Sequence, residues 1–421
     1  MLSDLSLAQF IRAARSQNRR APSSFALLKG RDFRHVWMAG GLFGTIRWLE
    51  MLSVGVYTFD RTQSPLLVSA MMVARMAPMI LFGSVFGAYA ERFDRKRILC
   101  VGLGLLLVLA LVMVLVGRTG EYSLWILAIA MFASGTFFAT DFPVRRTILA
   151  ELAGTSRVGN AMAIDSTTNN ATRMMGPALG GIVYQLVGLY GTYLLAAVIY
   201  LACLLLVLPI GYRSGSATRA VTGVFRTVAE GFQYIRGEPR LVATLMVTLI
   251  VNLWGFPFAT MVPVIGRDEM ALSATFVGLL AAAEGAGAFI GAIFVAAFAR
   301  ARFYMRLYVA GAFIFITAVL LFSFAPNFAV GWSIAIAGGF GVAGFATMQS
   351  TLTYTSADPA YRSRAMGALA VAIGGGPIGV FHVGLLAEWL GASTAVAVMA
   401  VEGLIALAVA TWYWRDLRKP G

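Results

Sequence analysis

The 421-residue sequence has little charge, and acidic residues are the scarcer kind. Only 12% of its residues are Asp, Glu, Lys or Arg, whereas soluble domains carry about 25%. Hydrophobic residues make up 59% instead. This shortage of charge argues against a soluble globular protein and indicates a chain that is integral to a membrane.

Cysteine and histidine are also scarce, with two of each. Cys100 and Cys203 lie in or near apolar runs, so neither a disulfide framework nor a metal-site spacing is present. The sequence also lacks a Walker-type Gly-Lys-Ser/Thr run, a catalytic triad and a cofactor motif. We therefore expect no metal, no cofactor and no enzymatic activity, and ATP-driven transport by this chain is disfavoured.

The basic residues are arranged in a way that speaks against nucleic-acid binding, despite a net charge of +14. They fall in short blocks between alternate apolar runs, as the positive-inside rule describes. The other set of loops holds only Arg61, Arg118 and Arg267. We expect a multi-pass protein of the cytoplasmic (inner) membrane with both termini in the cytoplasm and an even number of helices.

Twelve apolar segments can be drawn, and about 20 residues suffice to cross a bilayer. They cover residues 34–59, 65–89, 97–117, 123–143, 159–186, 189–211, 241–265, 273–299, 305–325, 328–355, 363–387 and 392–414. The resulting all-α organisation has a cytoplasmic basic segment (1–32), a six-helix half (33–212), a central loop (213–240), a second six-helix half (241–414) and a short tail (415–421).

The two halves echo each other. Leu67–Arg97 aligns without gaps on Phe276–Arg306, and this places Arg75 opposite Glu284. Two pseudosymmetric halves are the layout of a transporter whose site lies at the half interface.

A glycine–proline pair also recurs, as Gly176-Pro177 in the fifth segment and Gly376-Pro377 in the eleventh. Proline kinks a helix and glycine permits close helix contact. The pairs are candidate kinks, and the residues leave open whether they serve packing or an antiport-specific role.

The sharpest motif joins segments two and three and contains Gly87, Glu91, Arg92, Asp94 and Arg95. It resembles the loop signature of the major facilitator superfamily, which has Gly, three residues, an acid, Arg, any residue, Gly and two basic residues. Glu91 stands for the usual Asp and Asp94 for the second Gly. The branch that includes siderophore (enterobactin) and macrolide exporters often reads Asp-Arg-Phe-Asp-Arg-Arg-Arg here, which is similar.

Further stretches resemble the same branch, and the likeness covers about residues 31–414. They are 74–78, 173–181, 225–240 and 358–367. The resemblance implies the twelve-helix fold, with segments one, two, five and eight bordering a central cavity. It also implies that the loop motif is a conformational latch between the halves, although a topological anchor is the alternative.

Five ionisable residues fall near the bilayer centre at about 1.5 Å of rise per residue. They are Arg47, Glu50, Arg75, Arg173 and Glu284. Each costs roughly 2.5–3.5 kcal/mol on insertion scales, which marks a functional or paired group. Arg47 and Glu50 share a helical face and can pair, and Arg75 is expected to pair with Glu284.

Glu50 and Glu284 are candidate proton carriers, because burial raises a carboxylate's pKa and a nearby arginine lowers it. The three arginines are candidate substrate contacts and favour an anionic substrate. The alternative is a fixed salt-bridge network that holds the halves together.

Other polar residues in the apolar segments carry weaker signals. Asn252, Trp254 and Gln349 lie on segments that line the cavity in this family, although ordinary packing also explains them. His382 is either a proton relay or a helix-contact residue. Glu402 is mid-membrane and has no assigned role.

Two more acids lie nearer the cytoplasmic ends of their segments. Asp141 and Asp165 are expected to pair with the surface arginines Arg145, Arg146 or Arg157.

The sequence therefore predicts a secondary active transporter that exports a small amphipathic or anionic molecule, of siderophore or drug type, by proton-coupled alternating access. Its expected partners are that substrate, protons and membrane lipids, and it is expected to be a monomer. An uptake symporter on the same fold and a non-transporting membrane scaffold or sensor remain alternatives.

Overall fold

The structure is a computed structural model that describes residues 24–154, 157–212, 234–298, 300–358 and 361–418. Within these ranges the chain is helical and contains no strand. Most of the predicted basic segment and central loop, including most of 225–240, lies outside the described residues.

The amino-terminal half is built from long helices, and two features of the sequence set where they end or bend. Asp94 caps α4 by accepting a hydrogen bond from the Arg97 amide at 2.9 Å. Gly188 has φ 66°, a value that glycine adopts without strain, and bends α6. After a 3₁₀ turn at Ser24–Lys29, the elements are α2 (Arg31–Thr62), α3 (Pro65–Arg92), α4 (Arg95–Arg118), α5 (Leu124–Ala153) and α6 (Val158–Val207).

The carboxy-terminal half contains more interruptions. Its first crossing, Pro239–Glu269, includes two π-helical turns, and its fifth is broken between two helices. The elements are α8 (Pro239–Ile250), η3 (Val251–Gly255), α9 (Phe258–Val264), η4 (Ile265–Glu269), α10 (Ala274–Phe298), η5 (Ala301–Phe303), α11 (Tyr304–Phe322), α12 (Phe328–Ser356), α13 (Arg362–Ile373), α14 (Gly376–Leu390), α15 (Ala392–Tyr413) and η6 (Arg415–Leu417).

These helices account for the twelve predicted crossings. Among the described residues, ten helical stretches are long and apolar enough to cross a membrane. One of them, α6, has 50 residues and bends at Gly188, so it crosses twice. The 32-residue α2 is more polar and supplies the remaining crossing. The chain is thus a multi-pass membrane protein.

The gap-free alignment of the two halves is confirmed by where helices begin. It places Pro65 on Ala274 and Arg95 on Tyr304, and these four residues start α3, α10, α4 and α11. The repeat therefore reflects two copies of one helical arrangement.

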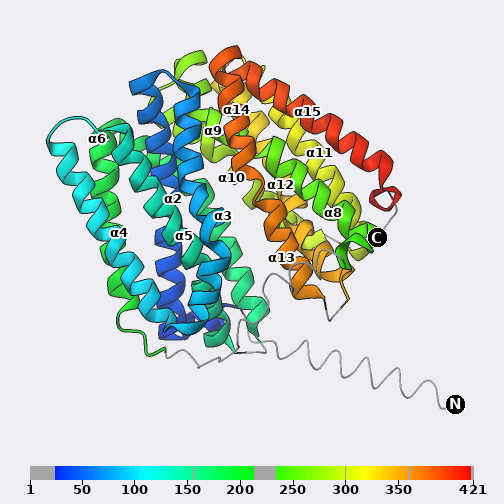
Figure 1. Ribbon diagram of the computed structural model, residues 1–421, viewed down its shortest axis with the longest axis horizontal. Helices are drawn as coiled ribbons and strands as arrows, with labels where there is room; N and C mark the ends of the chain where they lie inside the picture. The colour runs from blue at the N-terminus through cyan, green and yellow to red at the C-terminus, as the bar shows by residue number, and fades with distance from the viewer. Residues whose placement is uncertain (1–23, 155–156, 213–233, 299, 359–360, 419–421) are drawn as a thin grey trace.

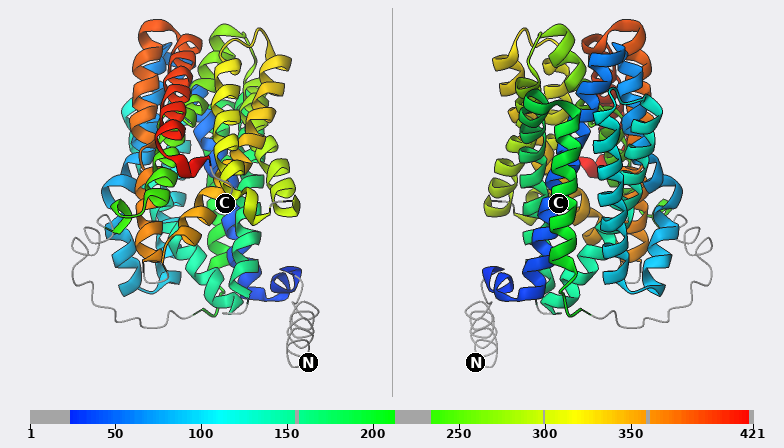
Figure 2. Two further views of the ribbon diagram at one scale, coloured as in Figure 1. Left: turned by 90° about the vertical axis from the view of Figure 1, so that its right-hand side faces the viewer. Right: turned by 90° about the vertical axis from the view of Figure 1, so that its left-hand side faces the viewer.

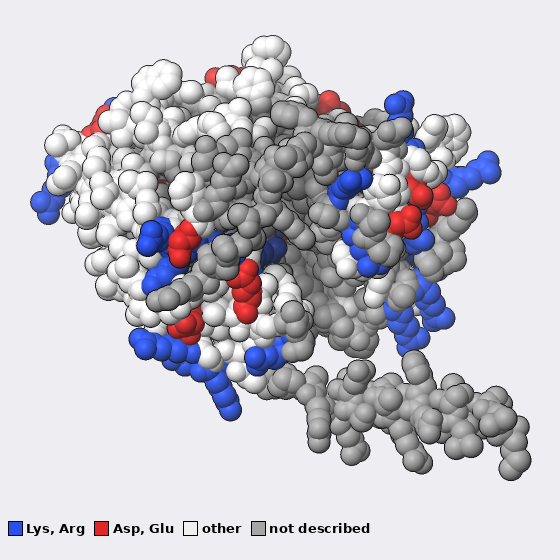
Figure 3. All heavy atoms as spheres, turned by 60° about the horizontal axis from the view of Figure 1, so that its bottom comes forward, with Lys and Arg blue, Asp and Glu red and all other residues white. Residues whose placement is uncertain are grey.

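The two halves lie side by side, approach each other at one end and diverge at the other (Figure 1). Figure 2 views them from the side, with the carboxy-terminal half toward the viewer in the left picture and the amino-terminal half in the right picture. Basic side chains gather at the diverging end (Figure 3). This end, called the basic end below, carries the helix termini near Arg97, Arg146, Arg240, Arg306 and Arg418. The other is called the opposite end.

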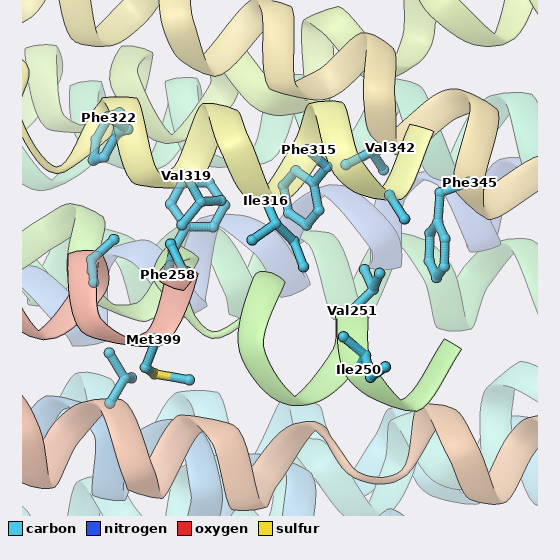
Figure 4. Close-up of a cluster of buried hydrophobic side chains, with 14 of the residues drawn as sticks. Ile250, Val251, Phe258, Phe315, Ile316, Val319, Phe322, Val342, Phe345 and Met399 are labelled. Carbon is cyan, nitrogen blue, oxygen red and sulfur yellow. The ribbon is translucent and has the colours of Figure 1, made fainter. Parts of the chain in front are cut away.

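Each half has its own apolar core. In the carboxy-terminal half, aromatic side chains of α9, α11 and α12 interlock, with Phe258 and Phe315 at 5.9 Å between ring centroids. Figure 4 shows this cluster together with Met399 of α15. The halves meet mainly where α6 packs on α10 and α3 packs on α14.

Candidate functional site

The first buried ion pair lies inside the amino-terminal half. An Arg75 guanidinium nitrogen of α3 donates to Glu50 Oε2 of α2 at 3.1 Å, and Ser134 of α5 donates to the same oxygen at 3.0 Å. The Arg75 and Glu50 side chains are only 6% and 2% exposed. The pair therefore ties three helices of one half together.

The second ion pair joins the two halves. Arg173 of α6 contacts Glu284 of α10 at 2.7 Å. The other carboxylate oxygen of Glu284 is buried and has no hydrogen-bond partner in the described part of the chain. Glu284 is therefore satisfied on one side only, at the interface where the halves meet.

Both expected pairings were wrong, although the residues themselves gather as predicted. Arg47 does not pair with Glu50, and Arg75 does not pair with Glu284. Glu50 faces α3 and α5, where it accepts hydrogen bonds from Arg75 and Ser134 rather than from Arg47, one turn earlier on its own helix. Sequence alignment of two halves shows that positions are equivalent, not that they touch.

Arg47 is 9% exposed and touches aromatic rings instead of a carboxylate. Its guanidinium carbon lies 4.3 Å from the Phe138 ring centre and 4.6 Å from that of Trp48. One terminal nitrogen donates to Asn169 at 3.4 Å, and its Nε is buried without a partner among the described residues.

The Arg173 side chain extends this stack toward the carboxy-terminal half. Its guanidinium carbon lies 5.5 Å from the Trp48 ring centre and 5.2 Å from that of Phe256. Phe138, Arg47, Trp48, Arg173 and Phe256 thus form a row of alternating rings and cations, called the aromatic–arginine ladder below. The sequence analysis missed its three rings, because apolar segments contain many aromatic residues.

Two pockets lie beside the ladder. One, of about 10 Å³, is lined by Arg47, Phe138 and Asn169 and extends to the charged residues near the basic end. The other, of about 80 Å³, is lined by Trp48, Arg173 and Glu284 among others. Of the predicted midplane residues, Arg47 borders a pocket inside the amino-terminal half, and Arg173 and Glu284 border a pocket between the halves. Glu50 and Arg75 line neither pocket.

Asp141 and Asp165 pair as predicted. Arg145 binds Asp141 at 3.2 Å and also binds Asp165. Arg146 binds the second oxygen of Asp165 at 2.8 Å. This network links α5 to α6 within one half.

The loop motif is described only in part. Gly87, Glu91 and Arg92 fall in α3, but their side chains lie outside the described residues. Asp94 serves as the cap of α4.

Arg95 makes its contacts inside the amino-terminal half, where it reaches Glu151 at 2.7 Å and the Tyr212 hydroxyl at 2.8 Å. Tyr212 also donates to Glu151 at 2.5 Å. Burial, followed by this hydrogen bond to Glu151, raises the pKa of Tyr212. A latch across the halves is thus absent from the described contacts of Arg95, and it stays a prediction for another conformation.

Glu402 has partners that the sequence did not reveal. Trp254 donates its indole N–H to Glu402 at 2.8 Å, and His382 lies 3.2 Å from the same oxygen. The polar atom of Trp254 therefore points to α15 rather than to the pockets beside Arg47 and Glu284. For His382 this contact fits both predicted roles, proton relay and helix contact.

The remaining polar candidates, Asn252 and Gln349, make few contacts with other helices. Asn252, in the π-helical turn η3, donates to the Thr248 carbonyl of its own helix at 2.9 Å. The Gln349 side-chain oxygen is buried without a partner among the described residues. Neither residue lines the two pockets.

The two glycine–proline pairs differ in structure. α6 continues through Gly176 and Pro177, and Gly176 packs tightly on α2, where an added Cβ would lie 2.4 Å from Trp48 Cβ. By contrast, Gly376 begins α14 after a break at Gly374 and Gly375. Only the second pair interrupts its helix.

A family model described as transmembrane secretion effector matches residues 22–419, nearly the whole sequence. The chain belongs to this family of the major facilitator superfamily. Its curated relatives are named as transporters or as an efflux protein.

Several curated bacterial proteins are similar in sequence. The uncharacterized MFS-type transporter YfiS of Bacillus subtilis is 26% identical over 48% of this chain and 49% of its own length. The staphyloferrin A transporter of Staphylococcus aureus is 22% identical over 52% and 55%. Macrolide efflux protein A of Streptococcus pyogenes is 20% identical over 63% and 66%. These matches span about half to two thirds of each relative.

Solved structures share the fold at low identity. A POT family transporter in complex with a thioalcohol-conjugated peptide has a TM-score of 0.76 at 10% identity, covering 92% of this chain and 97% of that one. A bacterial homolog of the human lysosomal transporter Spinster, inward-facing and unoccupied, has a TM-score of 0.69 at 15% identity, covering 92% and 97%. These likenesses show the fold alone.

Proposed function

We propose that this protein is a secondary active transporter that exports a small amphipathic or anionic molecule across the inner membrane in exchange for protons. The midplane pockets would open alternately to each side as the halves rock. The relatives named for staphyloferrin A transport and macrolide efflux support a siderophore- or drug-like substrate. The basic end would face the cytoplasm together with both termini, and the protein would work as a monomer in the lipid.

The Arg173–Glu284 pair carries this proposal. It is buried, it joins the two halves, and one Glu284 oxygen is free to take a proton. Protonation would remove the carboxylate charge that holds Arg173, so proton binding and the contact between halves are linked. A carrier needs such a link, because a ligand shifts a conformational equilibrium only through its different affinity for the two states.

Polar contacts between described residues of the two halves support an inward-facing state. They lie at mid-depth, as for Arg173 and Glu284, or at the opposite end, as for Gln185 with Thr275 at 2.9 Å. The divergence of the ribbons at the basic end agrees with this arrangement (Figure 1).

The proposal is tested in everted membrane vesicles with an inside-acid gradient, using labelled staphyloferrin A and a labelled macrolide as probes. Export predicts gradient-driven accumulation by the wild type. Glu284→Gln should reduce accumulation at least tenfold while exchange of labelled for unlabelled probe continues. Glu402→Gln, a matched change within one half, should retain accumulation.

Other outcomes would contradict specific parts of the proposal. Probe that moves out of the vesicles together with protons would identify an uptake symporter. Wild-type accumulation by Glu284→Gln would remove Glu284 as the proton carrier. If neither probe moved in either direction, the substrate class named by the relatives would not apply to this chain.

A further inference from the structure

Arg47 and the ion pairs described above together contain five arginines and four carboxylates. The arginines are Arg47, Arg75, Arg145, Arg146 and Arg173, and the carboxylates are Glu50, Asp141, Asp165 and Glu284. Each carboxylate has an arginine partner. Arg47 is the arginine of this set that has no carboxylate partner among the described residues.

An isolated buried cation is costly, so Arg47 calls for an anion. Burial of a charge without a paired partner is unfavourable. The aromatic contacts offset part of this cost, because a desolvated cation is attracted to the face of a ring. The contact to Asn169, at 3.4 Å, is long, and the Nε–H has no acceptor. The donor edge of the guanidinium is thus available.

The surroundings of Arg47 specify the shape of that anion. A carboxylate matches the donor edge of a guanidinium with two parallel hydrogen bonds. Phe138 and Trp48 lie within 4.6 Å of the Arg47 guanidinium, so a group attached to the carboxylate meets ring surfaces. Aromatic rings prefer offset-stacked or edge-to-face contact with other rings.

We infer that Arg47, with Trp48 and Phe138, is the recognition site for a planar aromatic carboxylate, and that the substrate carries such a group. This inference rests on the proposed transport function and adds the substrate class. Only the carboxylate group would enter the pocket that Arg47, Phe138 and Asn169 line, because that pocket has a volume of about 10 Å³. Because Trp48 also contacts Arg173, an occupant of this pocket lies one ring from the ion pair that joins the halves.

Binding is measured on the purified full-length protein in nanodiscs by equilibrium dialysis, with no gradient and no transport. Labelled benzoate is the probe, and unlabelled cyclohexanecarboxylate, benzylamine and chloride are competitors. We expect benzoate to bind saturably and cyclohexanecarboxylate to compete at least fivefold less well than unlabelled benzoate. Benzylamine and chloride should not compete at equal concentration.

The variants separate a recognition role from a structural one. Arg47→Gln should weaken benzoate binding at least tenfold, Arg47→Lys should weaken it less, and Trp48→Leu should remove the preference for benzoate over cyclohexanecarboxylate. Arg302→Gln is the matched control, because Arg302 is exposed and its guanidinium also lies over a ring, that of Phe303 at 4.6 Å. It should bind like the wild type. Size-exclusion profiles show whether each variant is folded.

Three results would overturn the inference. They are no saturable benzoate binding by the folded wild type, equal binding by Arg47→Gln, and competition by chloride as strong as that by benzoate. Each leaves gradient-driven export in vesicles open. Conversely, benzoate binding that depends on Arg47 in a protein without proton-driven export would uphold the site and reject the proposed function.

Discussion

At the scale of single residues, Glu50 and Glu284 differ in what surrounds them. One oxygen of Glu50 accepts hydrogen bonds from both Arg75 and Ser134, in a site almost closed to solvent. Glu284 has one oxygen on Arg173 and one without a partner in the described part of the chain. The fuller set of bonds at Glu50 favours a structural role for it and leaves Glu284 as the stronger candidate for proton exchange.

Removal of the Glu50 charge should therefore destabilise the protein rather than uncouple it. Glu50→Gln leaves Arg75 buried without a counter-charge, which costs about 3–5 kcal/mol. We expect a clear fall in the melting temperature of the detergent-solubilised protein, measured by size-exclusion chromatography after heating. The double variant Glu50→Gln/Arg75→Met should recover most of that loss.

A melting temperature unchanged by Glu50→Gln would show that the pair contributes nothing to stability. It would then return Glu50 to the list of proton carriers.

The depth of the charged residues could be predicted from the sequence, but their partners could not. Depth follows from counting residues along a helix of known rise. The partner of Arg75 depends on how α3 is rotated against α2 and α5, which the residues of α3 alone do not determine. For the same reason the role of Glu402 was open until Trp254 and His382 were placed beside it.

At the scale of helices, the predicted apolar segments match the observed helices because a bilayer allows few backbone structures. Every backbone group in the lipid core must be bonded within the chain, so long apolar runs become helices. The continuous α6 was not predicted, because hydropathy does not report the bend at Gly188, where φ is 66°. The break before α14 directly precedes the candidate kink at Gly376-Pro377, and its Gly374 and Gly375 have φ values of −63° and −67°, which any residue can adopt.

The contact between α6 and α10 depends on two glycines that face each other. A Cβ added at Gly278 would lie 2.5 Å from the Pro177 carbonyl oxygen, and one added at Gly181 would lie 2.3 Å from that of Ala274. Backbone atoms this close to an added Cβ cannot move aside unless α6 and α10 shift apart.

Gly278→Ala should therefore separate the halves at the opposite end. We expect a longer distance between spin labels placed at Arg118 and Pro326, which lie at that end in different halves. Gly104→Ala is the control, because an added Cβ there meets nothing within 4 Å. If both variants gave the wild-type distance, the α6–α10 contact would not limit the approach of the halves.

At the scale of the whole molecule, the halves are held together at the opposite end by a cluster around Asp60. Arg267 donates to both oxygens of Asp60, at 2.7 and 3.2 Å, and Tyr184 lies 3.3 Å from one of them. Nearby, Glu388 accepts from the Ser64 hydroxyl at 2.7 Å. In the proposed transport cycle these bonds would break when the pockets open to that side, so they would set the balance between inward- and outward-facing states.

Asp60→Asn should shift that balance toward the outward-facing state. The Asp60 and Arg267 side chains are 28% and 32% exposed, so their ion pair stabilises the inward-facing state by about 1 kcal/mol. This corresponds to a change of about fivefold in the ratio of the two states. We expect the labels at Arg118 and Pro326 to show a larger long-distance population, and the reversed pair Asp60→Arg/Arg267→Asp to restore the wild-type distribution.

Glu121→Gln is the control, because it breaks an ion pair with Arg61 at the same end but within one half. An unchanged distribution in Asp60→Asn, or an equal shift in Glu121→Gln, would show that the Asp60–Arg267 bond does not govern opening.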